Sequence, residues 1–327
     1  MRRSETRALP ALLLAAALAA SLLAGCSPAA APAAEKYKVA IVAKSTRTEF
    51  WRSVFAGAET AATEYNMELS IDGPETEEDY TTQNAMVRKA VEDGADALVF
   101  SAIDYEANAA AIDEAAAAGA KIVVIDSGVH SQAPATYIGT DNYAAGKMAA
   151  QAALETSAEH LNVGLVNYDI NSANGQERER AVRDAFRGNA RVTIVDTINV
   201  LAVAEDAQAG TEELLRAHPE INTLIAFNEP TAVGAARAVS RLGLGESTWL
   251  VGFDSNVETV DKLQTGEVDA LIVQNPFAMG YLGVESAYKL LSDQSRQLEP
   301  VVSTATVIVD RSNMFTIDSQ KMLFSFE

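Results

Sequence analysis

Cysteine and histidine are scarce in this chain, which has one cysteine and three histidines among its 327 residues. A single cysteine excludes an internal disulfide. It also excludes the zinc sites that are built from four cysteines, or from two cysteines and two histidines. The histidines, His130, His160 and His218, are scattered along the chain, and none has an evident partner for acid–base catalysis.

The motifs of nucleotide-binding and hydrolytic enzymes are also missing. The sequence has no G-x-G-x-x-G after a predicted strand, no Walker loop, no H-E-x-x-H and no G-x-S-x-G. The segment Gly243-Leu244-Gly245 follows a predicted helix and precedes a predicted strand, which is the wrong order for a dinucleotide site. We therefore expect no catalytic residues, no cofactor and no bound metal.

The chain also has few positively charged residues. The chain has 25 Lys and Arg against 45 Asp and Glu, which gives a formal net charge of −20. Because contacts with nucleic-acid phosphates need a basic surface, this charge argues against a nucleic-acid partner. A hydrophobic fraction of 48% with 21% charged residues is typical of a globular protein. The length allows two domains, each with its own core.

The first 25 residues have the pattern of an export signal. Three arginines stand within the first seven residues, and a run rich in Ala and Leu follows them. Pro10 and Ser21 shorten the clean apolar run below the roughly 20 residues that a membrane span needs. We interpret residues 1–25 as a signal peptide that is removed from the mature protein.

The signal ends in Leu23-Ala24-Gly25-Cys26, which resembles a bacterial lipobox. This resemblance implies that Cys26 is lipidated and becomes the first residue after cleavage. Residues 26–36, rich in Ala and Pro, would then form an extended tether. The alternatives are an ordinary buried cysteine, or a signal that is cleaved nearby without lipidation. The predicted location is extracytoplasmic, with a lipid anchor in the bacterial cell membrane, at the cell surface or in the periplasm.

From residue 37 onward, short apolar runs alternate with helical patterns. The runs carry β-branched and apolar residues at consecutive positions, which is typical of strands buried on both faces. Strands are predicted at 39–43, 69–71, 97–102, 121–126, 137–139, 163–166, 192–195, 223–227, 250–253 and 270–273. Helices are predicted at 49–65, 82–93, 107–118, 142–156, 205–217 and 231–242. This alternation predicts an α/β fold with parallel sheets. Because about ten strands exceed the usual four to six of one sheet, we expect two doubly wound lobes.

Polar and aromatic residues follow several predicted strands, where open α/β sheets bind their ligands. An aromatic face packs well on the C–H surface of a sugar ring, and a carboxylate can accept strong hydrogen bonds from hydroxyls. Such residues are Phe50, Trp51, Asp126, Asn228, Asp254 and Gln274. Arg178 joins them from the segment 174–180, which we also interpret as part of a helix. Together they indicate a polyhydroxylated small molecule. The alternatives are that the two aromatics are core, that Asp126 and Ser127 cap a helix or form a turn, and that Arg178 is solvated.

The chain from residue 38 to about 309 resembles the type I periplasmic sugar-binding proteins of the ribose-binding class. The matching segments are spread over this span in the order expected for that family. They are Phe50-Trp51, Ile125-Asp126, Ile138-Gly139-Thr140-Asp141-Asn142, Gly146-Lys147, Arg178 before Ala181-Val182, Ala217-His218-Pro219, Phe227-Asn228 with Gly234, Val251-Gly252-Phe253-Asp254, and Gln274.

The resemblance implies two doubly wound parallel-sheet lobes that are joined by a three-crossing hinge and close on a sugar. The crossings would fall near residues 140–141, 274–275 and 302–304. The N-terminal lobe would then hold residues 37–140 and 275–303. The C-terminal lobe would hold residues 141–274 and 304–327. The tail from residue 310 is longer than in the ribose-binding class, and the sequence assigns it no role.

The resemblance also implies roles for the site residues. Phe50 and Trp51 would flank the sugar ring, and the ring hydroxyls would bond to Asp126, Arg178, Asn228, Asp254 and Gln274. Thr48 and Ser127 stand where the ribose-binding class has an asparagine and an arginine, so we include both in the predicted ligand-binding set. The aromatic residue expected near Ala202 has no match. These departures favour a different sugar, a polyol or a signalling molecule over ribose itself.

The leading hypothesis is a monomeric substrate-binding component of an ABC importer. It would close around a small-molecule ligand and present the closed shape to the transporter permease. The alternative is a sensory protein that presents its ligand to a membrane receptor or histidine kinase. A sugar-responsive repressor would need an N-terminal helix-turn-helix where this chain has an export signal. An extracytoplasmic hydrolase or dehydrogenase would need the motifs that are missing.

Overall fold

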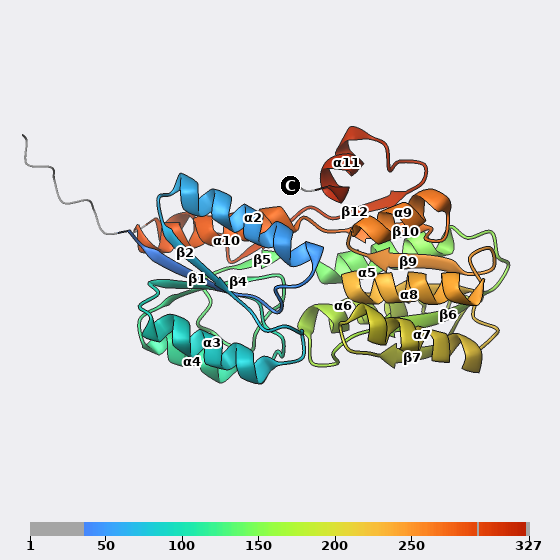
Figure 1. Cartoon of the computed structure of the whole chain (residues 1–327), viewed down its shortest axis with the longest axis horizontal. Helices are drawn as coiled ribbons and strands as arrows, with labels where there is room; N and C mark the ends of the chain where they lie inside the picture. Colours follow the sequence, from blue (N-terminus) through green and yellow to red (C-terminus); the bar gives the residue numbers. More distant parts are fainter. Residues whose placement is uncertain (1–35, 293, 325–327) are drawn as a thin grey trace, which may run out of the picture. The chain divides into compact units, whose positions relative to one another are not determined.

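Two six-stranded sheets organise the chain in the computed structural model, which describes residues 36–292 and 294–324 (Figure 1). The first sheet has the strand order β11-β5-β4-β3-β1-β2, and its paired strands are all parallel. Its strands are β1 (Lys38–Val42), β2 (Glu68–Asp72), β3 (Ala97–Phe100), β4 (Lys121–Ile125), β5 (Tyr137–Gly139) and β11 (Val301–Ser303).

The second sheet has the order β12-β10-β9-β8-β6-β7, and only β12 runs antiparallel to its neighbour among these described strands. Its strands are β6 (Leu161–Asn167), β7 (Val192–Asn199), β8 (Thr223–Ala226), β9 (Trp249–Phe253), β10 (Ala270–Val273) and β12 (Val307–Asp310). All predicted strands are present, and the predicted α/β class is confirmed. The short strands β11 and β12 were not predicted.

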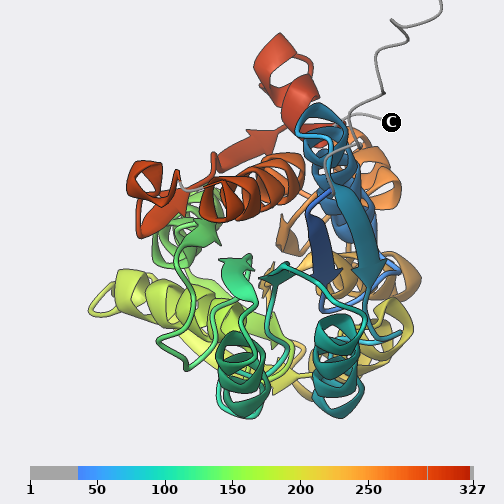
Figure 2. The ribbon, with the colours of Figure 1, turned by 90° about the vertical axis from the view of Figure 1, so that its left-hand side faces the viewer.

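Helices cover both faces of each sheet (Figures 1 and 2). The helices are α2 (Glu49–Glu64), α3 (Tyr80–Glu92), α4 (Ala109–Ala117), α5 (Asn142–Leu154), α6 (Ala173–Phe186), α7 (Ala204–Ala217), α8 (Glu229–Leu242), α9 (Val257–Thr265), α10 (Pro276–Leu291) and α11 (Ile317–Leu323). A short 3₁₀ turn, η1, spans Ser295–Gln297. The boundaries of the predicted helices differ from these by no more than two residues. Helix α6 was predicted only as a helical segment around Arg178 without bounds, and helices α9, α10 and α11 were not predicted.

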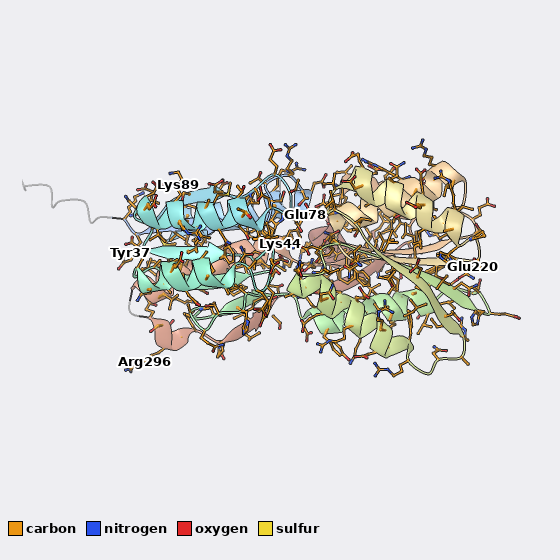
Figure 3. All side chains as sticks on the ribbon, turned by 90° about the horizontal axis from the view of Figure 1, so that it is seen from below. Tyr37, Lys44, Glu78, Lys89, Glu220 and Arg296 are labelled. Atoms are coloured by element: carbon orange, nitrogen blue, oxygen red, sulfur yellow. The ribbon has the colours of Figure 1, made fainter. Side chains whose placement is uncertain are left out.

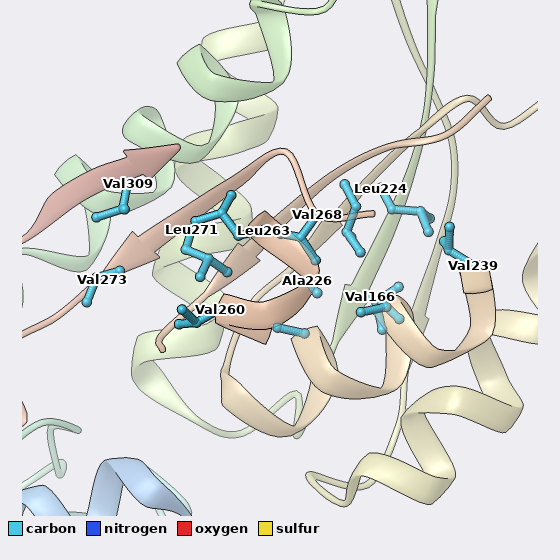
Figure 4. Packing of buried hydrophobic residues seen from close by; sticks show 14 of the residues in the cluster. Val166, Leu224, Ala226, Val239, Val260, Leu263, Val268, Leu271, Val273 and Val309 are labelled. Atoms are coloured by element: carbon cyan, nitrogen blue, oxygen red, sulfur yellow. The ribbon is translucent and has the colours of Figure 1, made fainter. Parts of the chain in front are cut away.

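Alternate residues of one strand enter different cores, as parallel strands covered on both faces require. In β1, Val39 and Ile41 pack with α2 and α10, whereas Ala40 and Val42 pack with α3 and α4. The second sheet is arranged in the same way, with α5 and α6 on one face and α7, α8 and α9 on the other. Figure 4 shows part of the latter core, in which Val166 and Leu224 pack near Val239 of α8.

We call the first sheet with α2, α3, α4 and α10 the first lobe, and the second sheet with α5 to α9 and α11 the second lobe. The chain passes between the sheets after β5, after β10 and after β11. Consequently α10 and β11, late in the sequence, join strands from its first half. The predicted signal peptide, Cys26 and the tether residues up to 35 lie outside the described residues. Within the described part, no helix combines the length and the apolar character that a membrane crossing requires.

The contact between α2 and α10 depends on two glycines. A Cβ atom at Gly280 would overlap the carbonyl oxygen of Val54, and one at Gly57 would overlap the carbonyl oxygen of Phe277. The two helix backbones therefore pack at a distance that no other residue type permits. This close contact fixes α10 on the first lobe.

Replacing Gly280 or Gly57 with alanine should lower the free energy of unfolding by about 1–3 kcal/mol or more, because the helices must separate to relieve the overlap. Urea denaturation followed by circular dichroism would measure the loss. Gly245→Ala is the matched control, since its Cβ would lie 3.6 Å from the nearest side-chain atom, which is ordinary contact. Equal stabilities of Gly280→Ala and Gly245→Ala would contradict this account of the packing.

Candidate functional site

A small cavity of about 20 Å³ lies between the two lobes, at the carboxyl ends of their strands. This is where open parallel sheets place their ligand sites. Its wall combines charged, amide and aromatic side chains from both lobes. They are Lys44, Thr48, Phe50, Trp51, Glu77, Asp126, Tyr168, Asn174, Arg178, Asn228, Glu229, Pro230, Asp254 and Gln274.

The structure brings eight of the nine predicted ligand-binding residues to this one cavity. They are Thr48, Phe50, Trp51, Asp126, Arg178, Asn228, Asp254 and Gln274. Ser127 does not line it. Ser127 is buried, and its Oγ has no hydrogen-bond partner among the described residues. The sequence analysis did not select Lys44, Glu77, Tyr168, Asn174, Glu229 or Pro230. Lys44 and Glu229 both come soon after the end of a strand, so the same strand-end rule could have selected them. Glu77 lies in a loop, where no sequence pattern marks a ligand site.

Asp126 and Asp254 occupy equivalent places at the ends of β4 and β9. Both have left-handed backbones, with φ of 56° and 67°. Such φ values are uncommon for residues other than glycine and concentrate at functional sites. Each carboxylate is buried, and each lines the cavity. The strained turn therefore delivers one carboxylate from each lobe to the same space.

Hydrogen bonds hold both carboxylates in place. Asp126 accepts from Ser101 Oγ at 2.9 Å and from Asn174 Nδ2 at 3.2 Å. Asp254 accepts from Gln274 Nε2 at 2.6 Å and from the backbone N–H of Glu229 at 3.0 Å. Burial raises the pKa of Asp126, and it raises the pKa of Asp254 to about 6. Each carboxylate still has lone pairs that could accept a further bond.

Arg178 and Asn228 bring unpaired donors to the cavity. The Nε of Arg178 donates to Asn142 Oδ1 at 2.9 Å, and Nη1 donates to the carbonyl of Phe227 at 2.7 Å. Its guanidinium lies over the ring of Phe253, 4.5 Å from the centroid. Arg178 Nη2 and Asn228 Nδ2 are buried and have no partner within the described part of the chain. An unpaired buried donor lowers the stability of the folded protein by about 1–3 kcal/mol. A ligand that offers acceptors to these two atoms would therefore be stabilising.

Lys44, Glu77 and Trp51 form a connected group on one wall. Lys44 Nζ pairs with Glu77 Oε2 at 3.0 Å and donates to Ser172 Oγ at 3.2 Å (Lys44 is labelled in Figure 3). Trp51 Nε1 donates to Glu77 Oε1 at 2.9 Å. Burial by itself lowers the pKa of Lys44, but the charges of Glu77, Tyr168 and Asp126 and the hydrogen bond to Glu77 together outweigh it and raise the pKa above its usual range. Lys44 therefore stays charged. The hydrogen bond from the indole N–H to Glu77 fixes the orientation of the Trp51 ring.

Phe50 and Trp51 belong to a hydrophobic core and to the cavity wall at once. Their rings meet edge to face, with centroids 5.3 Å apart and an interplanar angle of 85°. Trp51 also stacks on Phe55, with centroids 6.2 Å apart. Both residues pack with the core beneath α2. The two interpretations of this pair, core and ligand contact, are thus compatible.

Glu229 connects the two lobes at the edge of the cavity. Its carboxylate accepts the backbone N–H groups of Phe50 at 2.9 Å and of Glu49 at 3.2 Å. Asn256 Nδ2 donates to it at 2.9 Å. Burial raises the pKa of Glu229 to about 7, and the charge of Asp254 acts in the same direction.

Despite these carboxylates, residues 36–292 and 294–324 contain no group of three or more His, Cys, Asp and Glu residues that could hold a metal ion. The cations that lie closest to the acidic side chains in this wall are Lys44 and Arg178, whose charges lower the pKa of Asp126 against the effect of burial. The cavity is therefore a charged but largely compensated polar site.

Removing the cation of the buried ion pair should destabilise the protein. Lys44→Met leaves the Glu77 carboxylate buried without its cation and should lower the free energy of unfolding by about 3–5 kcal/mol. The double variant Lys44→Met/Glu77→Gln should recover part of this loss, because Glu77 is then neutral and only Asp126 still lacks the charge of Lys44. A double-mutant cycle by urea denaturation would measure both effects. The control is Arg88→Met, which breaks an exposed pair with Glu114 and should cost about 1 kcal/mol or less. A loss in Lys44→Met no greater than in the control would refute the account.

Comparisons with known proteins agree with this arrangement. The model of the periplasmic binding protein domain matches residues 39–295. The chain is 27% identical over 285 residues to the D-ribose/D-allose-binding protein of Pseudomonas aeruginosa, covering 84% of this chain and 89% of that protein. It is 24% identical over 265 residues to a ribose import binding protein of Bacillus subtilis, covering 80% of this chain and 84% of that protein.

Solved structures are similar over most of the chain. A carbohydrate transporter solute-binding protein from Agrobacterium radiobacter, in complex with D-arabinose, superposes with a TM-score of 0.85 at 25% identity, over 89% of this chain and 99% of that one. A sugar transporter from Clostridium phytofermentans superposes with a TM-score of 0.76 at 30% identity, over 84% and 99%. These findings confirm the resemblance seen in the sequence: the chain belongs to the periplasmic binding protein domain family.

Proposed function

We propose that this protein is the substrate-binding component of an ABC importer and that it binds a monosaccharide or related polyol in the cavity between its lobes. The observation that carries the proposal is the pair of unpartnered buried donors, Arg178 Nη2 and Asn228 Nδ2, in the same cavity as two buried carboxylates. The names of relatives that bind ribose, allose and arabinose support it.

A sugar hydroxyl can donate one hydrogen bond and accept others, so it suits both kinds of group. Asp126 and Asp254 would accept from hydroxyls, whereas Arg178 and Asn228 would donate to them. The free space in the cavity is small, about 20 Å³, so the lobes would have to separate before a ligand could enter between them.

The other predicted residues would act in different ways. Phe50 and Trp51 would contact the apolar face of the ring. Gln274 Nε2 donates to Asp254, and Gln274 Oε1 accepts from Thr140 Oγ1 at 2.6 Å. Gln274 would therefore chiefly orient the Asp254 carboxylate. Thr48 caps α2 by accepting the N–H of Trp51, and its side chain would border the ligand. We propose no direct ligand contact for Ser127.

We further propose that ligand capture proceeds by closure of two domains. Residues 37–140 and 275–303 would form one domain, and residues 141–274 and 304–327 the other. The three passages of the chain between the sheets would serve as the hinge. The closed protein would present surfaces of both domains to the importer's permease. It would act as a monomer outside the cytoplasm, tethered by lipidated Cys26, and without catalytic activity or a cofactor.

A thermal-shift screen would test the ligand class. Saturation at about 1,000 times the dissociation constant adds about 4 kcal/mol to the stability of a binding protein. At least one member of a panel of pentoses, hexoses and polyols, D-ribose, D-allose and D-arabinose included, should therefore raise the melting temperature by several degrees. If no sugar or polyol in the panel raises it, the proposed ligand class is wrong.

The carboxylate of Asp254 gives a sharper test at the level of the site. Asp254→Asn preserves the shape but removes a charged acceptor, and bonds to charged groups contribute about 1.5–3 kcal/mol. The affinity for the sugar that gives the largest shift should fall at least about tenfold, as measured by titration calorimetry. Asp261→Asn, on the exposed side of α9, is the matched control and should bind as the parent does. Equal affinities of the two variants would remove Asp254 from the ligand site.

A further inference from the structure

Carboxylates of each lobe accept backbone N–H groups of the other lobe around the cavity. Glu229 accepts from Phe50 and Glu49, and Glu49 Oε2 accepts from Val257 at 3.3 Å. Glu78 Oε1 accepts from Ala202 at 2.5 Å (Glu78 is labelled in Figure 3). These bonds exist only while the lobes are in contact, so they favour the closed arrangement.

Two of these carboxylates act at helix starts and are arranged reciprocally. Glu229 is the first residue of α8 and binds the N–H groups of the first two residues of α2. Glu49 is the first residue of α2 and binds the N–H of Val257, the first residue of α9. The first N–H groups of a helix have no partner within it, and the helix start carries partial positive charge. Each carboxylate therefore supplies a charge-assisted cap to a helix of the opposite lobe.

Glu229 is also bound to groups around the ligand cavity. Its own backbone N–H donates to Asp254 Oδ2 at 3.0 Å, and Asn256 orients its carboxylate. The helix start that it holds carries Phe50 and Trp51, both of which line the cavity. One residue thus joins a carboxylate of the second lobe to the aromatic pair of the first.

We infer that Glu229 is a positioning residue which latches the start of α2, and with it Phe50 and Trp51, onto the second lobe when the protein closes, with Glu49 as the weaker reciprocal latch. The inference rests on the proposed function, because positioning the aromatic pair matters only if a ligand is captured there. The side chain of Glu229 is 6% exposed, so its bonds are sheltered from competing water. The Glu49 side chain is 34% exposed, which makes its contribution smaller.

A disulfide trap would measure the closed population without any ligand. The backbone N–H of Tyr105 in the first lobe donates to the carbonyl of Asn171 in the second at 3.0 Å, so cysteines at these positions would meet in the closed arrangement. The parent for the assay is the full chain with Tyr105→Cys, Asn171→Cys and Cys26→Ser. Its cross-linking rate under diamide at pH 8, where the Glu229 carboxylate is charged, reports how often the lobes close.

In this parent, Glu229→Gln should slow cross-linking about tenfold, which corresponds to about 1.4 kcal/mol. Glu49→Gln should slow it about threefold. The matched control is Glu246→Gln, an exposed residue of the loop before β9, which should leave the rate unchanged. The urea midpoint and the reactivity of the free thiols toward iodoacetamide should be the same in all variants, because only the closing equilibrium changes.

Cross-linking of Glu229→Gln at the parent rate would overturn the inference, and so would a parent that does not cross-link. If Glu229→Gln does not fold, the exposed Glu49→Gln variant decides, and a parental rate in it overturns the inference. No sugar is present in this assay. A failed sugar screen therefore refutes the proposed ligand without affecting the latch, and a failed trap refutes the latch without affecting the ligand.

Discussion

The arrangement of this protein depends on compensating charge that is buried between two lobes. Taking a single ion out of water costs several kcal/mol, so each buried ion needs a partner of opposite charge or several hydrogen bonds. Lys44 meets this need for Glu77, and Arg178 lowers the pKa of Asp254 against the effect of burial. The neutral side chains of Ser101, Asn174 and Gln274 donate further hydrogen bonds to the two aspartates. The cavity is stable because two cations and these hydrogen bonds together offset its buried carboxylates, yet two donors have no partner among the described residues.

The parallel sheets explain why these groups meet. Parallel strands end at one edge, and the helices that follow begin at the same edge with free N–H groups. When the carboxyl ends of two such sheets face each other, polar strand-end residues gather from both sides without any sequence proximity. The left-handed backbones of Asp126 and Asp254 show that both lobes place an aspartate at the strand end by the same kind of turn. The same geometry gives Glu229 and Glu49 a helix start of the opposite lobe within reach.

This arrangement suits the recognition of a small molecule. The carboxylates, the arginine and the amides of the wall are held by hydrogen bonds within the protein, and under the proposed function they would bond to the hydroxyls of a ligand. The aromatic pair is anchored from beneath by its core and from the side by Glu77. Because the cavity has walls from both lobes, a ligand can be enclosed only when the lobes come together. If the lobes open and close as proposed, ligand binding and closure would be thermodynamically coupled.

Much of the fold was predictable from residue patterns alone. Runs of consecutive β-branched residues identify strands that are buried on both faces, and every one of those predicted strands is present. Positions after strand ends identified six of the fourteen residues of the cavity wall, since the end of a parallel strand is where a ligand site forms. The helix α10 and the strands β11 and β12 were not predicted. Both strands lie at the edge of a sheet and pair with a single neighbour that is distant in the sequence, which a local pattern does not encode. Helix α10 carries apolar residues around much of its surface, so it shows no clear helical period.

The sequence by itself determined the α/β class, the strands, and eight of the residues that line the cavity. Only the tertiary structure decided that Lys44 is buried against Glu77, because a lone lysine after a strand is ordinarily solvated and a loop glutamate has no periodic signal. It also decided that Ser127 lies outside the cavity wall and that Glu229 reaches the start of α2. These contacts join residues far apart in the chain, and such pairings arise from the packing of complete elements, which local patterns do not encode.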